Sequence, residues 1–205
     1  MSLFPMFVKL AGRDCLVVGA GRVGQTKIAS LLAARAPVRV VAPRATRQVA
    51  AWARANTVRW LARPFEPADL DGAFLAIAAT SSSDVNELVF RECQRRGVLC
   101  NVVDDPPRCD FYYPAVVRRG ELQIAVSTGG HSPALAQRLR RELEEQFGPD
   151  YAPWLEAIGK ERRMLLASRL DPRHRRRLLK QLASRKSFEA VTRRARPRGA
   201  SRRRR

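Results

Sequence analysis

Short apolar runs and longer amphipathic stretches alternate through roughly the first half of the chain. Five runs are rich in Val, Leu, Ile and Ala and bounded by turn residues, as buried strands are, and they cover residues 15–18, 38–42, 58–62, 74–79 and 98–103. Three intervening stretches suit helices and cover residues 22–35, 47–56 and 84–96. Strands that alternate with helices in this way predict an α/β fold with a doubly wound parallel sheet.

A glycine-rich turn follows the first apolar run. Gly19, Gly21 and Gly24 stand in G-x-G-x-x-G spacing between that run and the first predicted helix. Gly19 can adopt the angles of a tight turn, Gly21 lets a pyrophosphate approach the backbone, and Gly24 lets the helix lie close to its strand. Phosphates would then meet free N–H groups at the start of the helix. The strand–turn–helix context therefore predicts a dinucleotide site in a Rossmann-like sheet.

The second apolar run ends without the acid that usually binds the ribose hydroxyls in such folds. Its place is taken by Ala42, Pro43 and Arg44. The choice between NAD and NADP therefore stays open. Arg44 could face a 2′-phosphate, or it could be an ordinary exposed loop arginine.

Two adjacent acids follow the fifth apolar run, in the segment Asn101-Val-Val-Asp-Asp105. Ligands of a parallel sheet lie beyond the carboxyl ends of its strands, so these carboxylates would sit near a bound nicotinamide. Asp104 is our candidate for proton transfer, since positioned carboxylates serve as general bases. The alternative is that both acids form a simple turn before Pro106, where Asp is common.

The pattern changes after Pro106. Residues 115–117 and 122–126 are strand-like, with a hairpin turn at 118–121, and a helix follows from Ser132, a good N-cap, to Phe147. A two-stranded ribbon and one helix are too little to be stable alone, so we expect them to pack against another copy of the chain.

These patterns divide the chain into four expected parts. They are a dinucleotide-binding domain (1–113), a dimerisation segment (114–147), a helical, partly amphipathic region (148–192) and a basic tail without secondary structure (193–205).

Composition narrows the class of protein. At 205 residues with 45% hydrophobic content, the chain can bury a core of ordinary size. No apolar run is long enough to cross a membrane, and the N-terminus lacks the features of a signal peptide, so we expect a cytoplasmic protein. The four cysteines are irregularly spaced without a C-x-x-C pair, which favours free thiols over a disulfide framework or a tightly bound metal.

Charge is concentrated near the C-terminus. Residues 160–205 hold 19 of the 39 Lys and Arg but only three acids, so they carry +16 of the net charge of +20. The rest of the chain is close to balanced at +4. The basicity therefore belongs to an appendage and not to the predicted dinucleotide domain.

Seven motifs, taken together and in order, give the chain a family resemblance. They are Phe4–Leu10, the turn from Gly19 to Lys27, Val40–Pro43, Ile77–Thr80 with Asn86, Asn101–Asp104, Phe111–Pro114 and Ser127–Pro133. Over residues 3–150 the chain resembles the siroheme synthase N-terminal module family, that is, precorrin-2 dehydrogenase and sirohydrochlorin ferrochelatase. The tail from Arg193 has no counterpart in that family that we can name.

The resemblance implies an activity and a set of site residues. It implies NAD-dependent oxidation of precorrin-2, an anionic tetrapyrrole, to sirohydrochlorin, followed in bifunctional members by insertion of Fe²⁺, a substrate, to give siroheme. Asp104 matches the catalytic aspartate. The matched cofactor-binding positions are Gly19, Ala20, Gly21, Arg22, Val23, Gly24, Ala42, Pro43, Thr80 and Asn101, and the matched substrate-binding positions are Ser127, Thr128, Gly129 and His131. A homodimer is implied as well, with the segment from about Pro114 to Phe147 between protomers.

Two other hypotheses stay open. The chain could be a dehydrogenase that hands its product to a separate chelatase. It could also be a dinucleotide-sensing or nucleic-acid-binding protein that uses its basic appendage on phosphates. We do not expect a nucleic-acid partner, because the appendage lacks the interleaved aromatic residues of a single-strand binder. The length also leaves out the methyltransferase domain fused in some family members, so we expect precorrin-2 to come from elsewhere.

Overall fold

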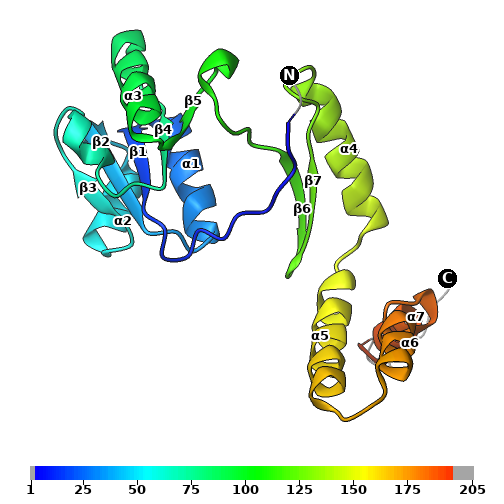
Figure 1. The fold of residues 1–205 in the computed structure, drawn as a ribbon. Helices are drawn as coiled ribbons and strands as arrows, with labels where there is room; N and C mark the ends of the chain where they lie inside the picture. Colours follow the sequence, from blue (N-terminus) through cyan, green and yellow to red (C-terminus); the bar gives the residue numbers. More distant parts are fainter. Residues whose placement is uncertain (1–2, 196–205) are drawn as a thin grey trace, which may run out of the picture. The chain divides into compact units, whose positions relative to one another are not determined.

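The computed structural model describes residues 3–195, with side chains to Thr192. Two compact units divide between Tyr113 and Pro114, and they are called here the first and the second unit (Figure 1). No helix in the described part of the chain is long and apolar enough to cross a bilayer.

The first unit is built on a five-stranded parallel sheet. Its strands are β1 (Cys15–Ala20), β2 (Val38–Ala45), β3 (Arg59–Leu61), β4 (Leu75–Ala78) and β5 (Leu99–Val102), in the spatial order β3-β2-β1-β4-β5. All four neighbouring pairs are parallel. The predicted α/β class and doubly wound sheet are confirmed. The strand order reverses between β1 and β4, which is where ligands of such sheets bind.

Helices cover both faces of this sheet. They are α1 (Arg22–Ala33), α2 (Arg47–Arg54) and α3 (Ser83–Arg96), with short 3₁₀ helices η1 (Pro67–Leu70) and η2 (Pro106–Arg108). Alternate residues of β1 point to opposite faces: Val17 packs in the core with α1 and α2, and Leu16 packs in the core with α3 and η1. Figure 1 shows the helices on the two faces of the sheet, and the two cores between them are buried.

The second unit begins with the predicted hairpin and helix. Strands β6 (Ala115–Arg119) and β7 (Leu122–Val126) pair antiparallel around a turn in which Gly120 has a φ of 58°. Helix α4 (Pro133–Gln146) starts at Ser132, whose Oγ accepts a hydrogen bond from the Leu135 N–H at 3.2 Å. Both features are therefore predicted correctly by the sequence.

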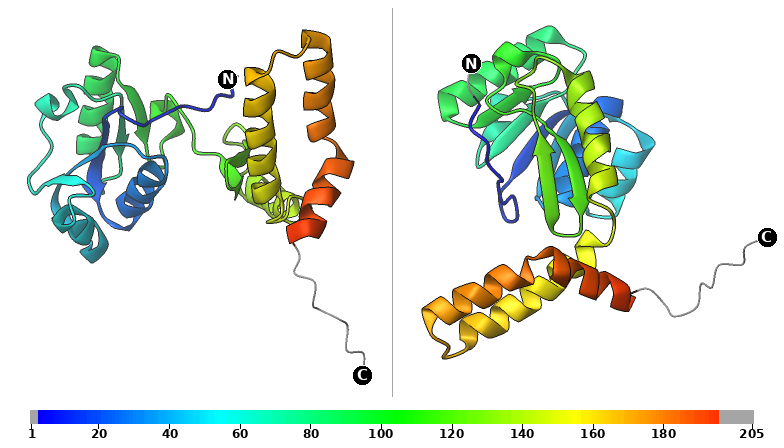
Figure 2. Two further views of the ribbon diagram at one scale, coloured as in Figure 1. Left: turned by 90° about the horizontal axis from the view of Figure 1, so that it is seen from below. Right: turned by 90° about the vertical axis from the view of Figure 1, so that its right-hand side faces the viewer.

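Three further helices complete the second unit: α5 (Tyr151–Ala167), α6 (Pro172–Leu182) and α7 (Arg185–Ala195). Helices α5 and α6 lie side by side (Figure 2). Neither contains a fully buried residue, and an aromatic cluster of Tyr151, Trp154 and Phe188 joins α5 to α7, with Trp154 and Phe188 ring centroids 5.2 Å apart. The prediction that the tail lacks secondary structure from residue 193 is wrong at its start, because α7 continues to Ala195; residues 196–205 lie outside the described residues.

Candidate functional site

The turn between β1 and α1 has the geometry that its glycines predict. Gly19 has a φ of 103°, and a Cβ on it would lie 2.4 Å from the Ala79 carbonyl oxygen. A Cβ on Gly24 would lie 2.1 Å from the carbonyl oxygen of Gly19. The turn is thus packed against the end of β4, and only glycine fits at residue 19 without movement of the backbone.

Gly21 differs from these two glycines, because open space surrounds the position where its Cβ would be. It is the N-cap of α1, and no side chain caps the free N–H groups there. Open space above uncapped N–H groups at a helix start is what a pyrophosphate needs. The residues of this turn therefore fit a dinucleotide. Of its other predicted contacts, Ala20 is buried, whereas Arg22 and Val23 are exposed.

The neighbouring strand ends supply further predicted positions. After β4, the Thr80 hydroxyl lies 2.7 Å from Oδ1 of Asn86, and the Thr80 N–H also donates to that oxygen, so the loop is fixed to α3. On the other side, β2 runs on through Pro43 to Ala45, three residues beyond the predicted end. Ala42 is buried and its carbonyl accepts a hydrogen bond from Trp60 Nε1 at 2.9 Å, whereas Pro43 and Arg44 are exposed. Ala42, Pro43 and Arg44 themselves carry no carboxylate that could select NAD.

Asn101 organises the loop that follows β5. Its side-chain Nδ2 donates to the Phe111 carbonyl at 2.8 Å and lies 3.3 Å from the Cys109 Sγ. Asp110 stabilises the same loop, because its carboxylate accepts a hydrogen bond from the Cys100 N–H at 2.8 Å. Asn101 is 7% exposed and also lines a small pocket, so it holds the loop in place while a cofactor contact by its remaining oxygen stays a prediction.

Asp104 and Asp105 play different parts in this loop. The Asp105 carboxylate is paired with Arg108, which also pairs with Glu87. The Asp104 carboxylate has no hydrogen-bond or ion-pair partner among the described residues, and Asp104 has a φ of 61°. Asp is among the few residues that tolerate this left-handed conformation, although it is strained, and such strain is found at functional sites. The two carboxylates therefore differ in the structure, because Asp105 is paired with Arg108 and Asp104 is unpaired among the described residues.

A pocket of about 150 Å³ lies beside Asp104. It is lined by Lys27, Asn101, Val102, Val103, Asp104, Asp105, Pro106, Cys109, Tyr112 and Tyr113. All of these residues belong to the first unit. Lys27 is carried by α1, and the N-terminus of this helix, at Gly21, is the predicted pyrophosphate site, called here the phosphate cradle. The arrangement places an unpaired carboxylate and an amine on one pocket beside the phosphate cradle.

Lys27 is the pocket residue that the sequence does not single out. Its Nζ lies 3.8 Å from the ring centroid of Tyr113, a cation–π distance. Burial lowers the pKa of the Lys27 ammonium, and the nearby Asp104 carboxylate and Cys109 thiol act in the opposite direction. A lysine in the middle of an amphipathic helix is usually solvated, so no sequence pattern could identify it.

The predicted substrate-binding loop lies in the second unit, between β7 and α4. Its hydroxyls are engaged within the loop: Thr128 Oγ1 accepts the Ser132 N–H at 3.1 Å, and Ser127 Oγ accepts the Gly129 N–H at 3.2 Å. The His131 N–H donates to the Thr128 carbonyl, while the His131 residue is exposed. Ser127 and His131 are both exposed, and contact of this loop with a substrate stays a prediction.

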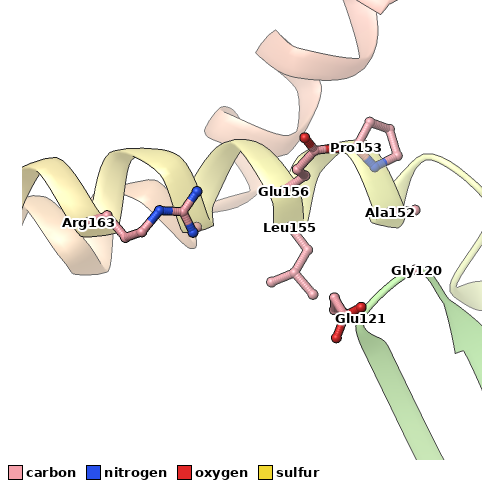
Figure 3. A pocket seen from close by; sticks show the side chains of 8 residues that line it. Gly120, Glu121, Ala152, Pro153, Leu155, Glu156 and Arg163 are labelled. Atoms are coloured by element: carbon pink, nitrogen blue, oxygen red, sulfur yellow. The ribbon is translucent and has the colours of Figure 1, made fainter. Parts of the chain in front are cut away.

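A larger cavity, of about 720 Å³, lies in the second unit between the tip of the β6–β7 hairpin and α5. Figure 3 shows Leu155 pointing toward the hairpin tip at Gly120 and Glu121. Small and apolar residues make up most of the lining, together with three charged side chains, Glu121, Glu156 and Arg163. None of its lining residues belongs to the β1–α1 glycine turn or to the Asp104 loop, so the features expected of a dehydrogenase site lie at the smaller pocket.

Comparison with known proteins gives a match in each unit. Residues 6–115 match a family model described as "Putative NAD(P)-binding", and residues 119–146 match a model described as "Sirohaem biosynthesis protein central". A siroheme synthase of Cronobacter sakazakii is 43% identical over 159 residues, which are 78% of this chain and 34% of that protein. A siroheme synthase of Methylobacillus flagellatus is 42% identical over 178 residues, 87% of this chain and 38% of that protein. The chain thus spans just over a third of the length of these relatives.

A solved structure illustrates the similarity along nearly the whole chain. It is that of SirC, a precorrin-2 dehydrogenase, with a TM-score of 0.77 at 23% sequence identity, covering 94% of this chain and 98% of that one. The likeness extends the shared fold through both units.

Proposed function

The chain belongs to the siroheme synthase N-terminal module family, and from that premise we propose that it oxidises precorrin-2 to sirohydrochlorin with NAD. The observation that carries the proposal is the unpaired Asp104 carboxylate on a pocket beside the β1–α1 phosphate cradle. A dehydrogenation removes a hydride and a proton, so it needs a dinucleotide and a base held close together. Both requirements have a counterpart at the carboxyl edge of the sheet.

Each part of the site has a separate task in this proposal. The N–H groups at the start of α1 and the open space at Gly21 bind the pyrophosphate. NAD, when bound there, accepts the hydride. The Asp104 carboxylate takes the proton that leaves the tetrapyrrole, and the Asn101 hydrogen bonds keep the Asp104 loop folded over β5 during the transfer.

Insertion of Fe²⁺ into sirohydrochlorin is the second step that we propose. Fe²⁺ is a substrate of this step, and the ring must lose its pyrrole protons as the metal enters. Asp104 is free to accept such protons because no side chain among the described residues pairs with it. The same carboxylate would thus serve two proton transfers on the same ring.

A homodimer is the assembly that we propose, through residues 114–147. The β6–β7 hairpin is a sheet of only two strands, and sheets of this size need further packing to be stable. The first unit also carries exposed apolar side chains at Phe4, Met6 and Phe7, which are 83%, 62% and 70% exposed. Apolar groups exposed in this density commonly mark an interface. Sedimentation equilibrium would test the assembly, and a monomer at micromolar concentration would contradict it.

The four cysteines are free thiols, three of them buried, which fits a reducing compartment; we propose the cytoplasm.

The test of the enzymatic proposal is an anaerobic incubation of the purified chain with precorrin-2 and either NAD or NADP. Conversion to the sirohydrochlorin spectrum with NAD, faster than in a no-enzyme control, is the expected result. Fe²⁺ is then added, and accelerated metal insertion would support the second step, whereas oxidation alone would identify a dehydrogenase that passes its product to a separate chelatase. No oxidation with either dinucleotide would refute the proposal.

A further inference from the structure

The amine of Lys27 has an unusual environment for a helix lysine. It is half-buried, and within the described residues it makes neither a hydrogen bond nor an ion pair. Its one close contact is the face of the Tyr113 ring, 3.8 Å from Nζ to the centroid. A lysine that merely covers apolar surface keeps its charged end in water, but here the charged end itself packs on the ring. The contact therefore fixes the amine on the Asp104 pocket.

The groups that face this amine come from several elements. The carboxylate of Asp104, after β5, and the thiol of Cys109, after η2, interact with it electrostatically. Tyr112 and Tyr113 complete the lining from the following segment. Asp105 also lines the pocket, but its charge is balanced by Arg108. Asp104 is thus the one unpaired carboxylate on the pocket within the described chain.

We propose that Lys27 is a positioning and proton-releasing residue that acts through Asp104, an inference that rests on the proposed dehydrogenation. Its amine lies on the same pocket as the Asp104 carboxylate and is held there by the Tyr113 ring. When Asp104 takes a proton from the substrate, the amine loses its neighbouring negative charge and releases one proton to water. Asp104 then passes its proton by way of a water molecule to the neutral amine, so the site regains its starting charge with one proton released per hydride transferred.

The physical reason is the balance of charge between half-buried Lys27 and exposed Asp104. Burial lowers the pKa of Lys27, and the negative charge of Asp104 opposes that effect. Neutralising Asp104 removes the opposing interaction, so the ammonium becomes more acidic at the moment when a proton must leave. An arginine at this position would keep a positive charge but could not release a proton.

The first test uses the full chain without any substrate. Its five lysines are methylated with ¹³C-formaldehyde, the Lys27 signal is assigned as the one missing from Lys27→Arg, and every signal is titrated by NMR. We expect Lys27 to titrate at lower pH than the other four lysines, and at still lower pH in Asp104→Asn. Titration of Lys27 together with the exposed lysines, unchanged by Asp104→Asn, would overturn the inference even if the dehydrogenase activity is confirmed.

The second test compares three variants by their pH–rate profiles. Lys27→Met, which removes the charge, should lower kcat by roughly ten- to 100-fold, whereas Lys27→Arg, which keeps a charge that cannot titrate, should recover part of kcat but lose the dependence on pH above neutrality. Lys160→Met, on the exposed part of α5, is the matched control and should behave as the wild type. Equal thermal midpoints and NAD affinities would exclude a folding defect.

Two outcomes of the kinetic test would overturn the inference. A rise in KM for Lys27→Met with kcat and the pH profile unchanged would make Lys27 an anchor for a substrate carboxylate. A Lys27→Arg profile identical to that of the wild type would show that no proton leaves through this residue. If the wild type itself oxidises no precorrin-2, the proposed function fails, and the NMR titration still decides whether Lys27 and Asp104 are coupled.

Discussion

The two units of the chain differ in how they are held together and in the charge they carry. The first unit has two dry cores on either side of a parallel sheet, with Leu16, Ile28 and Ile77 fully buried. In the second unit, α5 and α6 have no fully buried residue, and α5 is joined to α7 by an aromatic cluster. Precise placement of catalytic atoms needs a rigid frame, so the chemistry is expected in the first unit.

The two units also differ in charge, because the second unit carries a positively charged helix face. Four cations of α6, Arg173, Arg176, Arg177 and Lys180, are exposed and follow i, i+3, i+4, i+7 spacing, which puts them on one face of the helix. None of the four has an ion-pair partner among the described residues. An unpaired positive face of this kind attracts polyanions over a distance of about a Debye length. We therefore expect the first unit to determine kcat and the second to influence capture of the anionic substrate.

The largest effects are expected from two glycine substitutions in the first unit. Gly19→Ala should destabilise the fold by several kcal/mol, because its φ of 103° is strained for Ala and its Cβ would lie 2.4 Å from the Ala79 oxygen. Gly21→Ala should keep the wild-type thermal midpoint, because its Cβ would enter open space, yet weaken NAD binding on the order of 100-fold. Calorimetry and NAD titration measure both. Equal behaviour of the two variants would contradict the distinct roles of these glycines.

A smaller effect is expected from the positive face of α6. Replacing Arg173, Arg176, Arg177 and Lys180 together by Gln should raise KM for the tetrapyrrole roughly three- to tenfold with little change in kcat. The effect should shrink at high salt, because screening weakens attraction at the surface. Steady-state kinetics at two ionic strengths measure it, and Arg91, an exposed arginine of α3, gives the control Arg91→Gln. A fall in kcat alone would place these cations in the chemistry instead.

The smallest effect on turnover, and a clear one on stability, is expected at Asp69 in the first unit. Asp69 is 4% exposed, and Arg63 donates to both of its carboxylate oxygens, at 2.9 and 2.6 Å. Burial alone would raise the pKa of Asp69, but the hydrogen bonds from Arg63 and from the Glu66 N–H outweigh it and hold the pKa below its usual value. Arg63→Gln should therefore lower the urea midpoint of unfolding, because it leaves the buried Asp69 carboxylate without its cation.

The sign of the pH dependence at Asp69 follows from the lowered pKa. The stabilisation is complete above the unfolded pKa of about 3.9 and is lost as pH falls through the lower pKa of the folded state. Urea unfolding at neutral pH and near pH 3 measures this, and the difference between wild type and Arg63→Gln should shrink at the lower pH. If the difference in stability between wild type and Arg63→Gln were the same at both pH values, the Arg63–Asp69 pair would not stabilise the protein through charge. Turnover per folded molecule should stay unchanged.

Periodicity was enough to predict the sheet and its helices, because buried parallel strands and amphipathic helices leave strong patterns. Boundaries were less certain: β2 runs to Ala45, where it is bulged against β1 near Ala20, and such a bulge leaves no mark in the apolar pattern. The glycine turn was predicted in detail, since φ and close packing at Gly19 and Gly24 allow few other residues.

The candidate site was predictable only in part. Asp104 and Asp105 are equivalent in sequence, and only the folded loop shows that Arg108 pairs with Asp105. Lys27 joins the pocket from a helix about 75 residues earlier, a contact that depends on how α1 packs beside the β5 loop. Long-range contacts of this kind come from tertiary structure and have no local sequence signal.

The proposed role of Asp104 as the proton acceptor is tested most directly by comparing the wild type with Asp104→Asn in a single turnover. Asn is chosen because it tolerates the left-handed φ of 61° and removes only the basic carboxylate. NAD is titrated into each protein, precorrin-2 is added anaerobically, and NADH is followed by its absorbance. We expect equal NAD affinity and NADH formation at least about 100-fold slower in Asp104→Asn. Equal rates of NADH formation in the two proteins would contradict the proposed role.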